Sequence, residues 1–131
     1  FAYTSQFSSH TMEYFVKLTE NYNMIPVLTH VERYPALIND PSIIGELKDM
    51  GVIIQTNSNS YTKKASFFSK LKLIKLIKGG YIDVIGSDAH SLTHNDPRTF
   101  TEALDFISAK CGQSTVRKMM SNAEEIFNSA L

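Results

Sequence analysis

The chain has 131 residues, which is enough for one domain with a substantial core and too few for two ordinary domains. Thirteen basic residues balance thirteen acidic residues, and this zero net charge argues against bulk electrostatic binding to nucleic acid or an anionic membrane. A single cysteine excludes an internal disulfide, and no apolar stretch is long enough to span a bilayer, so we expect a cytoplasmic enzyme or domain. The densest basic run has the spacing of the solvated face of an amphipathic helix: Lys70, Lys72, Lys75 and Lys78.

The predicted elements alternate between strands and helices. In chain order we expect the end of a strand at 1–7, a helix over 11–22, a strand over 25–29, a loop over 31–39, a helix over 41–50, a strand over 52–56, a loop over 57–62, a helix over 63–78, a strand over 81–86, a helix over 97–111, and two short helices over 114–120 and 122–128. Three apolar strands, each followed by a helix, are typical of βα units that share a parallel sheet. Ligands of such sheets gather at the carboxyl ends of the strands.

Polar side chains stand at two of these predicted strand ends. Asp88 and His90 follow the third strand, and because they are two residues apart they can converge on one point. His30 follows the first strand, so that imidazole and carboxylate groups from two strand ends suggest one shared metal site. Arg33 suggests an anionic substrate, because its planar fork suits two oxygens of a phosphate or carboxylate.

Simpler interpretations of the same residues stay open. Asp88 can cap a turn and His90 can be an ordinary loop residue, while Glu32 and Arg33 can pair with each other and with surface neighbours. Tyr34 is expected to pack beneath its loop rather than to line a binding site. Serine and cysteine nucleophiles are poorly supported, because the chain has no Gly-x-Ser-x-Gly elbow and no Cys-x5-Arg signature.

Three segments carry a resemblance to a known family. The runs PVLTHVERY at 26–34, MGVIIQTN at 50–57 and IGSDAH at 85–90 resemble the PHP superfamily. More closely, they are similar to the manganese-dependent protein-tyrosine phosphatases of bacterial capsule and exopolysaccharide operons. The resemblance extends from about residue 25 to residue 131, and it implies a distorted TIM-like (PHP) barrel of alternating βα units with a parallel sheet.

The resemblance also assigns roles at the site. The positions that match metal ligands, for divalent ions and most of all Mn, are His30, Asp88 and His90. Arg33 matches the arginine that holds the phosphoryl group; Asn95 stands where the family has a second arginine, and Arg98 follows three residues later as the candidate for that role. Such enzymes hydrolyse phosphotyrosine with a metal-activated water and form no phospho-enzyme intermediate.

The resemblance further implies that residues 1–131 are the C-terminal part of a single barrel domain. The N-terminal strands and their ligands are missing from this chain, so we expect it to be inactive alone and to offer open barrel edges for oligomerisation. The implied partner is a phosphotyrosine protein, the tyrosine kinase of polysaccharide export, with no nucleic acid and no membrane insertion. The alternatives are another PHP-type phosphoesterase, acting on a small phosphate such as histidinol phosphate, and a non-catalytic barrel fragment.

Overall fold

The computed structural model describes residues 7–87 and 97–129 of the chain. The elements in chain order are α1 (Ser9–Glu20), β1 (Val27–Leu28), the 3-10 helix η1 (Val31–Arg33), α2 (Pro35–Asn39), α3 (Pro41–Asp49), β2 (Ile53–Asn57), the 3-10 helix η2 (Ser58–Tyr61), α4 (Phe67–Lys78), β3 (Val84–Gly86), α5 (Pro97–Cys111) and α6 (Gln113–Ser129).

The three strands form one parallel sheet in the order β1-β2-β3. Leu28 of β1 lies opposite Ile54 of β2, and both side chains are fully buried. Each strand is followed by helical structure, which is the βα alternation that the sequence predicts. The fold class is therefore α/β, mostly helical, with a small parallel sheet.

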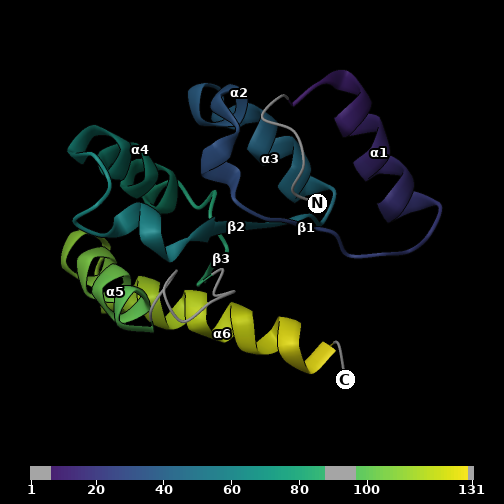
Figure 1. The fold of residues 1–131 in the computed structure, drawn as a ribbon. Coiled ribbons are helices and arrows are strands. Elements are labelled where there is room, and N and C mark those ends of the chain that lie inside the picture. The colour runs from purple at the N-terminus through teal and green to yellow at the C-terminus, as the bar shows by residue number, and fades with distance from the viewer. Residues whose placement is uncertain (1–6, 88–96, 130–131) are drawn as a thin grey trace.

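Helices cover both sides of this sheet. In the view of Figure 1, α2, α3 and α4 lie above the strands, whereas α5 and α6 lie below them. α5 packs against η2 and α6, and α6 packs along β3. The core draws buried apolar side chains from every layer, including Phe15, Leu28, Leu37, Ile44, Leu47, Ile54, Leu73, Ile77 and Ile107.

Local signals account for several helix starts. The side chain of Asp40 accepts a hydrogen bond from the Ser42 N–H, and Pro41 occupies the first turn of α3, as predicted. Pro35 likewise begins α2, so the prediction of an irregular loop over 31–39 is wrong. The N–H of the first helical residue has no partner within the helix, so a proline, which lacks this N–H, costs no hydrogen bond at that position.

Four further predictions differ from the structure. The helix expected over 63–78 begins only at Phe67, because Ser66 caps it by accepting from the Ser69 N–H. The two short closing helices are one continuous helix, α6. The strand expected over 81–86 is limited to β3. Of the strand end expected at 1–7, only Phe7 lies within the described residues, and it is not in a strand.

Within residues 7–87 and 97–129, no helix combines the length and apolar character that crossing a membrane requires.

Candidate active site

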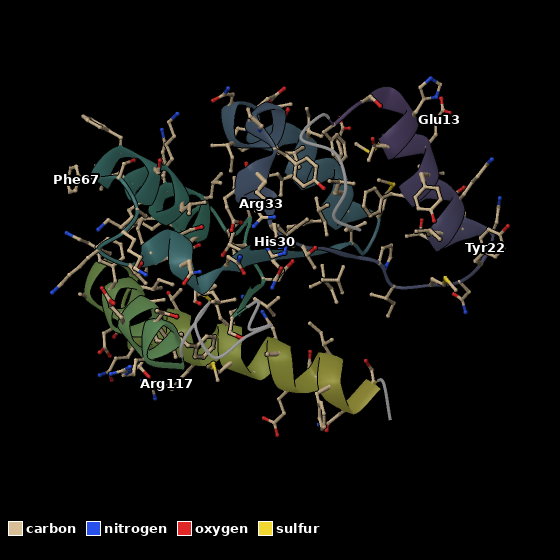
Figure 2. The ribbon with its side chains drawn as sticks, viewed as in Figure 1. Glu13, Tyr22, His30, Arg33, Phe67 and Arg117 are labelled. Carbon is tan, nitrogen blue, oxygen red and sulfur yellow. The ribbon has the colours of Figure 1, made fainter. Side chains whose placement is uncertain are left out.

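The carboxyl ends of the three parallel strands lie at one edge of the sheet, and His30 stands at this edge. β1 leads through Thr29 into His30, β2 ends at Asn57, and β3 ends at Gly86. Asp88 and His90 follow β3 directly in sequence but lie outside the described residues. Figure 2 shows His30 and Arg33 near the middle of the view, on the segment between β1 and α2.

His30 has an unusual backbone conformation. Its φ of 56° and ψ of 47° are left-handed, where histidine is enriched over most other non-glycine residues. Holding such a conformation costs about 1–3 kcal/mol, so the surroundings must stabilise it. One stabilising contact comes from the neighbouring strand β2: the His30 N–H donates to Oε1 of Gln55 at 3.2 Å.

Gln55 also depends on the neighbouring strand. A Cβ built on Gly86 of β3 would overlap the side-chain amide of Gln55, so the glycine provides the space in which that amide lies. The amide of Gln55 therefore contacts the ends of both outer strands. It links the segment that carries His30 to the segment that leads into Asp88 and His90.

Glu32 forms a second link across the same edge. Its Oε1 accepts from the Asn57 N–H at 2.9 Å and from the Ser60 hydroxyl at 3.0 Å. Burial raises the pKa of the Glu32 carboxyl, while these hydrogen bonds and the nearby His30 oppose that shift. The alternative in which Glu32 pairs with Arg33 at the surface is wrong, because this carboxylate is directed to β2 and η2.

Three buried oxygen atoms at this edge have no hydrogen-bond partner among the described residues. They are Oε2 of Glu32, Oδ1 of Asn57 and Oγ of Ser58. Buried polar atoms in folded proteins are nearly always satisfied, by water or by an ion where the protein itself does not do so. Free acceptor oxygens at the strand ends are compatible with a cation or with the water molecules that a cation would hold.

A cavity of about 450 Å³ opens beside these groups. Glu32, Pro35 and Ser60 line one side of it, and Ser69 and Lys72 of α4 line the other. This volume lies within the range of small-molecule sites, and its lining mixes apolar and charged groups.

The remaining predicted residues have different surroundings. Arg33 is exposed, which leaves its guanidinium accessible to an anionic substrate. Tyr34 is only 2% exposed and packs edge-to-face on Phe7, so the prediction that it packs beneath its loop is confirmed. Burial raises the pKa of the Tyr34 hydroxyl, and the charge of Arg33 opposes that shift. Arg98 is exposed at the second position of α5.

The donor set fits a divalent metal ion by its chemistry. Imidazole and carboxylate groups together suit first-row divalent ions such as Mn²⁺ and Zn²⁺. Over residues 7–87 and 97–129, no three His, Cys, Asp or Glu side chains gather closely enough to hold a metal. The predicted ligands Asp88 and His90 lie outside these residues.

Three contributors to this edge are absent from the sequence prediction of the site: Glu32, Gln55 and Gly86. Gln55 gives one local signal, since it is an amide directly after the apolar residues Val52, Ile53 and Ile54 of a predicted strand. Glu32 gives no comparable signal, because its partner Asn57 lies 25 residues away.

Known proteins with similar sequences belong to one family. A sequence model of the family described as "Capsular polysaccharide synthesis, CpsB/CapC" matches residues 3–128. The tyrosine-protein phosphatase CpsB of Streptococcus pneumoniae is 33% identical over 99 residues, which are 72% of this chain and 40% of that protein. CpsB of Streptococcus agalactiae serotype V is 30% identical over 108 residues, covering 78% of this chain and 44% of that protein.

A solved structure shares the fold. It comes from the work described as crystal structures of YwqE from Bacillus subtilis and CpsB from Streptococcus pneumoniae, unique metal-dependent tyrosine phosphatases. The TM-score is 0.75 at 22% identity, and the match covers 92% of this chain and 49% of that one. This chain thus spans less than half the length of the curated relatives it matches. A family model that extends over nearly the whole sequence shows that the chain belongs to the CpsB/CapC family of capsular polysaccharide synthesis.

Proposed function

We propose that this protein serves metal-dependent hydrolysis of phosphotyrosine in proteins. The observation that carries the proposal is the edge of the sheet at which His30, on a strained backbone, stands three residues before an exposed Arg33. The names of the CpsB relatives support phosphotyrosine as the substrate class.

The chain is proposed to form the C-terminal part of one TIM-like barrel domain of the PHP type. Its three parallel strands in sequential order, each followed by helical structure, are the arrangement of a sector of a βα barrel. The polar Gln55 lines a cavity of about 220 Å³ together with Val27, Val84 and Ile126. Relatives more than twice as long as the matched region provide the length that a complete barrel needs.

His30, Asp88 and His90 are proposed to hold divalent metal, with Mn²⁺ as the preferred ion. When bound there, the metal supplies Lewis-acid chemistry, which lowers the pKa of water and offsets the charge of the phosphate. The contribution of this chain is to fix His30: the left-handed backbone directs the imidazole, and Gln55 holds the N–H of the same residue. Glu32 anchors the turn from the other side through Asn57 and Ser60.

Arg33 is proposed to bind the phosphoryl oxygens and to stabilise the charge that builds on them in the transition state. Arg98 is proposed to assist from the start of α5, since Asn95 cannot supply a second guanidinium. The protein is proposed to act in the cytoplasm, and its partner to be the tyrosine kinase of polysaccharide export, which the family's description as capsular polysaccharide synthesis supports.

A substrate panel tests this function. The intact protein is assayed with Mn²⁺ on a phosphotyrosine peptide, a phosphoserine peptide and histidinol phosphate. We expect the highest kcat/KM for phosphotyrosine, and we expect Arg33→Ala to lower it by about 100- to 1000-fold, in the range for loss of one preorganised charge-stabilising donor. A higher kcat/KM for histidinol phosphate than for phosphotyrosine would instead identify a small-molecule phosphatase.

A further inference from the structure

Although the net charge of the whole chain is zero, one segment of it is strongly positive. Residues 63–78 contain six lysines and no acidic residue, whereas the rest of the chain has seven basic and thirteen acidic residues. The lysines are Lys63, Lys64, Lys70, Lys72, Lys75 and Lys78, and all but the half-buried Lys70 are exposed. One acidic side chain approaches them, since Glu102 of α5 accepts from the backbone N–H of Lys63.

The same segment exposes large apolar side chains. Phe67 and Phe68 are 61% and 78% exposed, and Leu71 is 39% exposed. The two phenylalanine rings meet edge-to-face with their centroids 6.2 Å apart. Figure 2 shows Phe67 at the outer end of α4, directed away from the rest of the protein.

Helical spacing places exposed apolar groups and Lys75 on one face, whereas the ammonium of Lys70 lies over the ring of Phe106 at 5.0 Å. Phe68, Leu71 and Lys75 are at positions i, i+3 and i+7, so they form one outward stripe of α4. The opposite face holds the core residues Leu73, Ile74, Leu76 and Ile77. We define the α4 patch as Phe67, Phe68 and Leu71 together with the five exposed lysines Lys63, Lys64, Lys72, Lys75 and Lys78.

We propose that the α4 patch binds the surface of an anionic lipid bilayer. Aromatic and leucine side chains enter the headgroup boundary, and lysines beside them are attracted to acidic lipids. The two rings project instead of lining a hollow: the cavity beside α4 is lined by Ser66, Ser69 and Lys72 but by neither phenylalanine. Peptides usually bind in a groove, which these projecting rings do not form. Two exposed aromatic rings beside lysines are better suited to insertion into a lipid surface.

The position of the patch has a consequence for the candidate site. α4 begins five residues after η2, which itself follows the carboxyl end of β2. The first turn of α4 is thus at the same end of the sheet as His30 and the cavity lined by Glu32 and Lys72. Membrane binding through this turn would direct the site edge toward the bilayer. This inference does not depend on the phosphatase activity.

Vesicle sedimentation tests the proposal directly. The purified intact protein is mixed with vesicles of phosphatidylcholine alone or of phosphatidylcholine with phosphatidylserine, at about 0.1 M and about 1 M ionic strength. We expect sedimentation with the phosphatidylserine vesicles at the lower ionic strength and little in the other three conditions. Each lysine near the surface contributes about fivefold in the partition coefficient, so Lys75→Gln with Lys78→Gln should lower it by about 25-fold.

Matched variants separate this patch from the rest of the surface. Phe67→Ser with Phe68→Ser should lower vesicle binding at least about tenfold, because two apolar insertions are lost. Phe127→Ser, at a 66% exposed phenylalanine of α6, should leave binding unchanged. Far-ultraviolet circular dichroism confirms that each variant is folded. The proposal is overturned if the wild-type protein does not sediment with the vesicles, or if the variant without the two phenylalanines sediments as well as the wild type. It is also overturned if the α4 patch binds an acidic phosphopeptide or a nucleic acid but not the vesicles.

Discussion

Gln55 contacts both segments that flank the candidate site, through the His30 N–H on one side and the space above Gly86 on the other. We predict that Gln55→Leu weakens Mn²⁺ binding to the intact protein by about 10- to 100-fold, as for loss of a group that orients a metal ligand. Gly86→Ala should produce a similar loss, because the added Cβ displaces the same amide. Metal titration monitored by calorimetry measures both effects without relying on activity.

Two comparisons make the Gln55 prediction specific. Gln55→Glu keeps an acceptor for the His30 N–H and should retain more metal affinity than the leucine variant. Gln113→Leu, at an exposed glutamine, should have no effect on affinity. Equal affinities for wild type and Gln55→Leu would show that this amide does not position His30.

Tyr61 is the largest fully buried side chain that carries a polar atom, and its hydroxyl lies 2.7 Å from Oγ1 of Thr56. Burial raises the pKa of Tyr61 well above its ordinary value of 10. Because the raised pKa belongs to the folded state, the unfolded chain loses its proton first as the pH rises. The stability that Tyr61 contributes is therefore complete below pH 10 and decreases above it.

We predict that Tyr61→Phe lowers the free energy of unfolding by about 1–3 kcal/mol at neutral pH, since it leaves the buried Thr56 hydroxyl unsatisfied. The difference from wild type should shrink above pH 10, by up to about 1.4 kcal/mol per pH unit. Urea denaturation at several pH values measures it. Tyr22→Phe, at a 66% exposed tyrosine, is the control and should change stability by less than about 0.5 kcal/mol throughout. A pH-independent difference for Tyr61→Phe would contradict the account.

At the scale of elements, Asp83 stands just before β3 and connects that strand to α3, β2 and α6. Its carboxylate bonds to Lys48 of α3 and accepts from the Ile54 N–H of β2 at 2.9 Å. Its backbone carbonyl accepts from the side-chain amide of Asn122 in α6 at 2.9 Å. These contacts place β3 between β2 and α6.

We predict that Asp83→Ala destabilises the fold by about 2–4 kcal/mol, because it leaves the Ile54 N–H and the ammonium of Lys48 without their partner. Lys48→Met should cost less than about 1 kcal/mol, since this ion pair is partly exposed, with 28% and 23% of the two side chains accessible. Denaturant unfolding of both variants measures the difference. Equal losses would mean that the ion pair, not the backbone contact, carries the stabilisation.

The same elements show how far sequence reasoning reaches. The βα alternation, the parallel sheet and the start of α3 follow from apolar strand patterns and from a local cap, so they are predictable. α6 is not predictable in this way, because Ser121 and Asn122 favour a break that packing against β3 and the bond to Asp83 override. α2 was missed because Pro35 breaks helices in general but favours the first position of one.

In the candidate site, too, some residues are predictable from the sequence and others are not. His30 and Arg33 are predictable, since each stands at a strand end in a short motif. The hydrogen bonds of Glu32 to Asn57 and of Gln55 to His30 each join residues 25 apart, so they depend on the strand register that only the fold provides. The roles of Asp88, His90 and Arg98 stay predictions.

At the scale of the whole molecule, β1 and β3 each pair on one side only within the described part of the chain. Open strand edges invite pairing with another chain. We predict that this 131-residue chain self-associates when it is prepared alone, as measured by light scattering. Ile25→Lys, which adds a charge beside β1 at a 69% exposed position, should shift the chain toward the monomer. A strict monomer in the wild-type chain would contradict this prediction.

The most direct test of the central claim is hydrolysis of a phosphotyrosine peptide by the intact protein, with and without Mn²⁺, for wild type and His30→Ala. We expect activity that requires Mn²⁺, that falls at least about 100-fold in the variant and that is absent from the 131-residue chain alone. Hydrolysis that is equally fast without divalent metal, or that is unaffected by His30→Ala, would contradict it.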